Sequence, residues 1–205
     1  MKRGNVMPKE TFQNLSVEKK AHIEQILLEN FYNRHVSQVK VSEIVEAMQM
    51  SRGAFYKYFQ DLEDAYTYLI HKCSISVHNA ILLSIQQHEQ DFFLGIEQFL
   101  IHCSELDRNS DYWKKLQLLT QNNELQAMKR TKMSPNSPMV KQWLTLLSAN
   151  QFVMDSLEEA LSFLYFIMAL VMNSLTDCIV NGWSKEELVT DFRFRKDWLL
   201  HGIAK

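Results

Sequence analysis

The sequence predicts an all-α protein, in which a small N-terminal unit of three helices precedes a larger helical body. Its 205 residues include only five glycines and three prolines, and helix-favouring residues such as Leu, Met, Glu, Gln and Lys are abundant. Apolar residues recur at helical spacing, and no alternating strand pattern of useful length interrupts them. We expect three segments, which are residues 1–15, 16–60 and 61–205.

Residues 1–15 are expected to form a flexible basic arm before the first helix. Ser16 can cap that helix, because its hydroxyl can accept a hydrogen bond from a free amide of the first turn. The apolar stripe that should face the core consists of Val17, Ile23, Ile26, Leu27 and Phe31.

Two short helical patterns and a tight turn occupy residues 41–59. One face of the first pattern is apolar and consists of Val41, Ile44, Val45 and Met48. Ser51 is placed to cap the second helix, in which Phe55 and Phe59 lie one turn apart and can be buried together. The outer face of this helix then consists of Arg52, Gly53, Ala54, Tyr56, Lys57 and Tyr58.

That outer face is small at its start, basic and aromatic, which suits a helix that enters the major groove of DNA. Residues 1–60 carry nine Lys and Arg against six Asp and Glu, a net charge of +3. The rest of the chain carries thirteen against eighteen, a net charge of −5. The positive balance coincides with the motif, as a phosphate-facing surface requires. We therefore interpret residues 16–60 as a helix-turn-helix DNA-binding domain, with a surface helical hairpin as the alternative.

The remaining chain predicts a further series of helices. Asp61 should cap a long helix that connects the two parts rigidly, because no Gly/Ser-rich linker separates them. Its inner side would consist of Leu62, Ala65, Tyr66, Leu69, Ile70, Cys73, Val77, Ile81 and Ile85. Further helices are expected over residues 91–106, 111–121, 139–147, 155–180 and 184–203, with a weaker pattern over 124–132 and a loop at 134–138. Ser184 and Glu187 form a capping-box pattern.

The motif resembles the N-terminal domain of the tetracycline-repressor (TetR) family of bacterial regulators. The matching residues are Ile44-Val45, Ser51-Arg52-Gly53 and Phe55-Tyr56-Lys57-Tyr58-Phe59, followed by an acidic helix start at Asp61. Two positions depart from the family pattern: Gln49 stands where glycine is usual, and Leu62 stands where a lysine is usual. Gln49 would have to adopt the geometry of the turn at some cost in strain.

The resemblance implies that Tyr56 contacts a phosphate of double-stranded DNA, and that the start of the second helix faces the groove. The residues that we expect to contact DNA are Lys40, Ser42, Ser51, Arg52, Gly53, Ala54, Tyr56, Lys57 and Tyr58.

The expected helix over residues 155–180 is apolar on more than one face and therefore needs covering on more than one side. A fully internal helix of a monomer would satisfy this pattern, and so would an interface. In TetR-like regulators the last two helices pair with their two-fold mates, so the resemblance implies a homodimer through the last two helices. Phe192, Phe194, Trp198 and Leu199 would complete that interface.

The middle helices are rich in Met and aromatic side chains, which can line an adaptable pocket or simply fill a core. The resemblance favours a pocket, because the family couples a small-molecule effector in this region to the separation of its two DNA-reading units. The candidate lining residues are His78, Phe99, Trp113, Met128, Trp143, Phe163 and Phe166.

A narrower resemblance concerns haem. The runs MPKETF and RGAFYKYFQDLEDAY are similar to haem-responsive members of the family from lactic acid bacteria, and His78 falls where that group has an iron-ligating His. Ligation by two histidines would need a second one from the distal helices, but none occurs between His102 and His201, and Asp155 stands at the matching place. His78 is thus either a haem ligand or a solvated or core-satisfied side chain, and no cofactor or metal is certain.

Several other classes of function find no support in the sequence. No phosphate-binding loop, metalloprotease motif or nucleophile elbow is present, which argues against an enzyme. Cys73, Cys103 and Cys178 show no zinc or disulfide spacing, and a reducing cytoplasm suits them. The N-terminus lacks the apolar region of a secretory signal, and the apolar stretch 161–172 is too short to span a membrane.

Together these observations predict a cytoplasmic, ligand-responsive transcriptional regulator, a repressor that a small molecule releases from a palindromic operator. The alternative is a helical ligand-binding or scaffolding protein that does not bind an operator.

Overall fold

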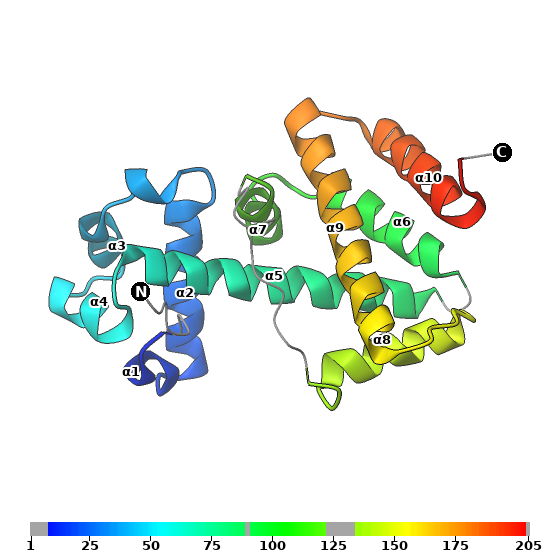
Figure 1. Ribbon diagram of the computed structural model, residues 1–205. Coiled ribbons are helices and arrows are strands. Elements are labelled where there is room, and N and C mark those ends of the chain that lie inside the picture. The colour runs from blue at the N-terminus through cyan, green and yellow to red at the C-terminus, as the bar shows by residue number, and fades with distance from the viewer. Residues whose placement is uncertain (1–7, 89–90, 122–133, 204–205) are drawn as a thin grey trace. The chain divides into compact units, whose positions relative to one another are not determined.

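The computed structural model describes residues 8–88, 91–121 and 134–203, and over these residues it contains helices and loops but no strand. The helices, shown in Figure 1, are α1 (Glu10–Gln13), α2 (Val17–Phe31), α3 (Val41–Ala47), α4 (Arg52–Tyr58), α5 (Leu62–Gln87), α6 (Phe92–Ser104), α7 (Asp111–Thr120), α8 (Pro138–Ala149), α9 (Leu157–Asn181) and α10 (Lys185–His201). A short 3-10 turn, η1 (Val36–Gln38), lies between α2 and α3. The predicted all-α class is confirmed.

The helices form two compact units. The first comprises residues 1–75 and 108–121, and the second comprises residues 76–107 and 122–205. The boundary predicted between residues 60 and 61 therefore lies inside the first unit. The first unit is larger than expected because it also includes the beginning of α5 and the later helix α7, which packs on α2.

In the first unit, α2 packs against α3 and α7, and α3 packs against α4. The buried face of α2 consists of Ile23, Leu27, Leu28 and Phe31. Ser16 caps α2 as predicted, because its side chain accepts a hydrogen bond from the Lys19 amide. Val17 was predicted to lie on the buried stripe, but it is 77% exposed, because the first residue of the helix lies beyond the edge of this core.

The segment that precedes α2 is folded, so the prediction of a flexible arm is wrong for residues 8–15. Residues 10–13 form α1, and Phe12 is buried. The centroid of its ring lies 5.0 Å from that of Phe59 and 5.1 Å from that of Tyr68. Burial of a phenylalanine side chain contributes about 2 kcal/mol, which offsets part of the conformational entropy lost when the turn is ordered. Residues 1–7 lie outside the described part of the chain.

In the second unit, α6 packs against α9 and α10, α10 packs against α9, and α8 packs against α9 (Figure 1). The close approach of α6 to the end of α5 occurs at Gly95, where an added Cβ atom would lie 2.5 Å from the Cα atom of Ile85. The hydroxyl of Ser84 donates a hydrogen bond to the Gly95 carbonyl at 2.8 Å. Glycine at this position therefore sets the separation of the two backbones.

The predicted starts of several helices are confirmed by their caps. Asp61 accepts a hydrogen bond from the Asp64 amide at 2.8 Å, and Pro138 lies in the first turn of α8. Ser184 and Glu187 form the predicted capping box at the start of α10. The weaker pattern over residues 124–132 lies outside the described residues.

One helix of the described chain, α9, is long and apolar enough to cross a membrane when only its length and composition are considered. The sequence prediction that this region is too short considered only residues 161–172, whereas α9 has 25 residues. Its apolar character has a partial explanation within the unit, because 39% of its most apolar window is buried against the other helices.

Candidate nucleic-acid interface

The turn between α3 and α4 is closed by a residue with left-handed backbone geometry. Gln49 follows the end of α3 and has φ of 51°. The Met50 amide then donates a hydrogen bond to the Val45 carbonyl at 2.9 Å, which satisfies a free carbonyl at the helix end. The positive φ predicted at Gln49 is confirmed, and the turn allows α4 to start in a new direction after only four intervening residues.

Two phenylalanines and a serine hold α4 in place. Phe55 and Phe59 are completely buried, and their ring centroids lie 5.5 Å apart. The Ser51 hydroxyl accepts a hydrogen bond from the Ala54 amide at 3.2 Å. Both predictions for this helix are therefore confirmed: Ser51 caps it, and one apolar face anchors it.

The opposite face of α4 is exposed and carries positive charge. Arg52, Gly53, Tyr56 and Lys57 are exposed, and Ala54 is half-buried. The Tyr56 ring lies edge-on to the ring of Phe55, with 5.4 Å between the centroids, so the anchored face also orients Tyr56. A Cβ atom added at Gly53 would meet only the Ser51 hydroxyl, at 3.8 Å. Packing within the described chain therefore does not require glycine there.

Tyr58 was predicted on the outer face of α4, and this prediction is wrong. Tyr58 is only 7% exposed, and its ring lies 5.9 Å from that of Phe12, in an edge-on arrangement. The reason is helical spacing, since positions three and four residues after Phe55 share its face. The anchored face of α4 thus consists of Phe55, Tyr58 and Phe59.

The start of α3 presents two further predicted residues, Lys40 and Ser42, and both are exposed. Nearby, Arg34 donates a hydrogen bond to Glu43 at 2.7 Å and another to the Gln38 carbonyl at 2.6 Å. The hydrogen bond from the Arg34 guanidinium holds the pKa of the Glu43 carboxyl below its usual range. Arg34 therefore ties η1 to α3, which leaves Lys40 as the exposed cation at this end of α3.

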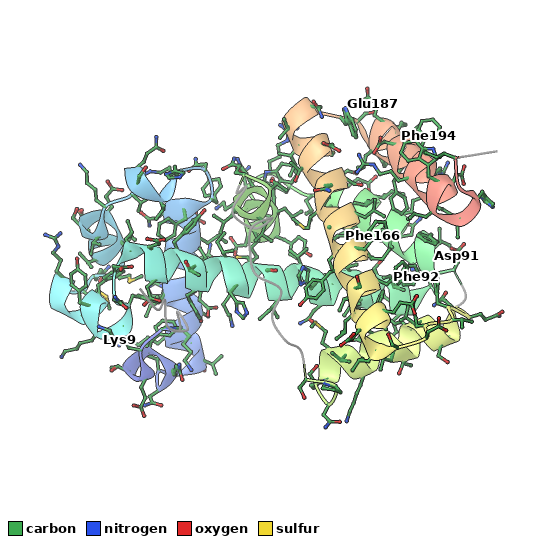
Figure 2. The ribbon with its side chains drawn as sticks, viewed as in Figure 1. Lys9, Asp91, Phe92, Phe166, Glu187 and Phe194 are labelled. Carbon is green, nitrogen blue, oxygen red and sulfur yellow. The ribbon has the colours of Figure 1, made fainter. Side chains whose placement is uncertain are left out.

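Sequence reasoning did not identify Lys9 as part of this region. Lys9 is exposed and lies where α1 meets α4 (Figure 2). Its ammonium donates a hydrogen bond to the Tyr56 carbonyl at 2.7 Å, and its amide donates one to the Tyr58 carbonyl at 2.8 Å. The available signal was Phe12, a large apolar residue within the otherwise polar run 9–14, which indicates a docked turn.

The predicted pocket residues fall in both units. His78, Phe99, Trp143, Phe163 and Phe166 belong to the second unit, whereas Trp113 belongs to the first and Met128 lies outside the described residues. Trp143 is completely buried and donates a hydrogen bond to the Ala160 carbonyl at 2.7 Å. Its ring and those of Phe92, Phe152, Phe163 and Phe166 form one aromatic cluster, part of which is labelled in Figure 2. Apart from Phe166, which is 44% exposed, these side chains fill space against one another.

A groove of about 510 Å³ lies between the end of α5 and α8 in the second unit. It is lined by Ile85, Gln86, Gln142, Thr145, Leu146, Ala149 and Asn150, and none of the predicted pocket residues is among them. The described residues contain no group of three or more His, Cys, Asp or Glu side chains that could hold a metal ion. Haem ligation by His78, a half-buried residue of α5, stays a prediction.

The described helices and the helix-turn-helix near the N-terminus together define a class of protein. All-helical proteins with this N-terminal motif are DNA-binding regulators. Residues 91–203 match the family described as tetracyclin repressor-like, C-terminal domain. Because this match covers more than half of the chain, the protein belongs to the TetR family of transcriptional regulators.

Solved structures of the same family have a similar fold. A TetR-family transcriptional regulator from Pectobacterium atrosepticum has a TM-score of 0.56 at 12% identity, over 92% of this chain and 97% of the other. A TetR transcriptional regulator from Rhodococcus sp. RHA1 has a TM-score of 0.50 at 12% identity, over 91% and 97%. One from Chloroflexus aurantiacus J-10-FL is 21% identical, with a TM-score of 0.47, over 94% and 90%.

Proposed function

We propose that the protein is a cytoplasmic repressor that binds a near-palindromic operator as a homodimer and leaves it when a small molecule binds. The exposed face of α4 carries this proposal. Arg52, Tyr56 and Lys57 point away from the helix side that Phe55 and Phe59 bury. A helix anchored in this way can enter a major groove without loss of its own packing.

The exposed residues divide into two roles. Arg52 lies in the first turn of α4, where residues of a recognition helix contact base edges, and a guanidinium can bind guanine through two hydrogen bonds. Tyr56 and Lys57 lie in the last turn and are placed for phosphate contacts, as are Lys40 and Ser42 at the start of α3. Ser51 caps the helix, and Gly53 and Ala54 keep its approach to the groove free of bulk.

A homodimer is supported by the apolar surface of the last two helices. Large apolar side chains are exposed on both of them, namely Phe166 and Val180 on α9 and Phe194, Trp198, Leu199 and Leu200 on α10. A group of this size on one unit is typical of an interaction surface. A two-fold interface there would give the dimer two α4 helices, which can contact successive major grooves about 34 Å apart.

Release of the operator needs an effector that binds the DNA-free state more tightly. A preference of a few kcal/mol is sufficient, because only differential affinity shifts such an equilibrium. The groove between α5 and α8 has the volume of a small-molecule site, and its amide and hydroxyl side chains would suit a neutral polar ligand. The aromatic cluster around Trp143 and Phe163 is a second location, if a ligand separates its rings.

Two substitutions in α4 test the operator-binding proposal. Lys57→Ala should weaken binding to every DNA sequence and flatten the salt dependence of the dissociation constant by about one unit of slope, because one phosphate contact is lost. Arg52→Ala should lower the preference for the operator over other sequences by about 1–3 kcal/mol. The measurement is fluorescence anisotropy on DNA from upstream of the gene and on a scrambled duplex, at several salt concentrations.

Lys141→Ala provides the matched control, because Lys141 is an exposed lysine on α8 in the other unit. It should bind both duplexes as the wild type does. An equal loss on both duplexes from Arg52→Ala, like the loss expected from Lys57→Ala, would contradict direct reading of the sequence by Arg52. Absence of any wild-type binding would instead favour a scaffolding or ligand-binding role.

A further inference from the structure

The end of the recognition helix α4 is bound by a residue from outside the helix-turn-helix. The last carbonyls of a helix have no partner within it. In α4, the Phe55 carbonyl accepts a hydrogen bond from the Phe59 amide at 3.0 Å. Lys9 supplies donors to two of the remaining carbonyls, with its ammonium on Tyr56 at 2.7 Å and its amide on Tyr58 at 2.8 Å.

Lys9 is held at this position by the burial of Phe12. The Phe12 ring packs against Tyr58 and Phe59 from the α4 region and against Tyr68 of α5. The Gln13 side chain closes the turn by donating a hydrogen bond to the Pro8 carbonyl at 3.1 Å. The ammonium of Lys9 is therefore directed to the end of α4 by a fixed backbone.

The electrostatics of this position are favourable for DNA binding. The C-terminal end of a helix carries a partial negative charge equivalent to about half an electron, which repels phosphate. Lys9 places a full positive charge on that end, and its side chain remains exposed. Lys57 belongs to the same turn and carries a second positive charge, and Tyr56 is the exposed aromatic residue whose carbonyl Lys9 binds.

We propose that Lys9 belongs to the DNA-binding surface, where it fixes the last turn of α4 and adds a positive charge that attracts the phosphate backbone of the duplex. This inference rests on the proposed function, because it assumes that α4 enters the groove. It extends the DNA-binding surface from the helix-turn-helix to the turn that precedes α2.

The test compares Lys9→Met, which keeps an unbranched stem and removes the charge, with Lys9→Arg, which keeps the charge and its donors. On the operator duplex, Lys9→Met should raise the dissociation constant about tenfold near 150 mM salt and reduce the salt slope by about one. Lys9→Arg should stay within about threefold of the wild type and keep its slope. Thermal unfolding of both variants should stay close to that of the wild type, because the hydrogen bond from the Lys9 amide to the Tyr58 carbonyl and the burial of Phe12 keep the turn docked.

Lys141→Met on α8 is the control for the loss of a surface charge, and Lys57→Ala is the positive control. The proposal is overturned if Lys9→Met binds like Lys141→Met while Lys57→Ala is impaired, a result that leaves operator binding intact. It is also overturned if Lys9→Met weakens binding without any change in the salt slope. A wild-type chain that binds no duplex would overturn both this inference and the proposed function.

Discussion

Four described residues have positive φ, and each of them follows the end of a helix. Gly182 and Gly202 follow α9 and α10, whereas Gln49 and Gln151 follow α3 and α8. Both glutamines precede an amide that donates a hydrogen bond back into the helix, from Met50 to Val45 and from Phe152 to Leu147. This hydrogen bond stabilises the left-handed residue at the helix end even where that residue is not glycine. A residue with a Cβ atom is nevertheless strained in the left-handed region.

Substitutions at Gln49 should therefore affect the free energy of unfolding in the opposite order to substitutions within a helix, with glycine more stable than valine. Gln49→Gly should leave the free energy of unfolding equal to or slightly above that of the wild type. Gln49→Val should lower it by about 1–2 kcal/mol, because a β-branched side chain tolerates positive φ poorly. Urea denaturation followed by circular dichroism gives both values.

The same pair of substitutions at Glu46 provides a control, because Glu46 is exposed and lies within α3. There the order should reverse, since glycine is the poorer helix former by a few tenths of a kcal/mol. If valine and glycine rank alike at both positions, the strain assigned to Gln49 is absent.

At the residue scale, the sequence predicted the helix caps and the buried residues of the helix-turn-helix well. Ser51, Phe55 and Gln49 were assigned correctly because their roles depend on neighbours within five residues. Tyr58 was misplaced, although the spacing rule that buries Phe59 also covers it. Lys9 was missed, because its partners Tyr56 and Tyr58 lie almost fifty residues away along the chain.

At the scale of elements, the second unit depends on how closely its helices approach. The backbone of α6 reaches α5 at Gly95, and an added Cβ atom would lie 2.5 Å from the Ile85 Cα atom and 2.9 Å from the Ser84 carbonyl oxygen. Both neighbours are backbone atoms, so rotation of a side chain cannot make room. Helical periodicity alone gives no sign of this approach.

Gly95→Ala should lower the stability of the protein by about 2 kcal/mol or more, because the two helices must move apart. Gly53→Ala is the matched control, since Gly53 is also a helical glycine, but an added Cβ atom there would meet only the Ser51 hydroxyl oxygen, at 3.8 Å. It should raise stability by up to about 1 kcal/mol through helix propensity. Thermal and urea unfolding of the two variants would show opposite signs, and equal signs would contradict the assigned packing.

Ion pairs between helices that lie far apart in the sequence cannot be predicted from the order and spacing of the helices. Glu97 is buried in α6, and both of its carboxylate oxygens accept hydrogen bonds from Arg193 of α10, at 2.9 and 2.7 Å. Such a pair joins residues that are 96 positions apart, so neither helical spacing nor composition indicates it. The attachment of α7 to α2 was missed for the same reason, since the contact between Gln25 and Asp111 spans 86 positions.

At the scale of the whole molecule, the proposed function requires two copies of the chain. A single recognition helix contacts only a few base pairs. In a dimer, once one recognition helix has bound its half-site, binding of the second becomes an intramolecular step. The exposed apolar side chains of α9 and α10 provide a surface for this pairing within the second unit alone. Trp198 is the largest of them and is 55% exposed in the single chain.

Trp198→Glu should therefore produce a folded monomer. A carboxylate within an apolar two-fold interface would lose its hydration on both subunits, and this desolvation would oppose pairing. Sedimentation equilibrium should show the mass of one chain, with the helical content unchanged by circular dichroism. The affinity for a full palindromic operator should fall by at least about a hundredfold, to that of a half-site.

Val17→Glu makes the same change at an exposed apolar residue of α2, in the other unit, and should remain a dimer with unchanged helical content. A Trp198→Glu variant that stays dimeric would place the interface elsewhere, because an exposed tryptophan outside an interface would tolerate the charge. A monomer that still bound the palindrome as tightly as the wild type would show that dimerisation does not supply the operator affinity. A monomer with lost affinity for the operator is expected only if α9 and α10 form the interface that joins the two helix-turn-helix domains.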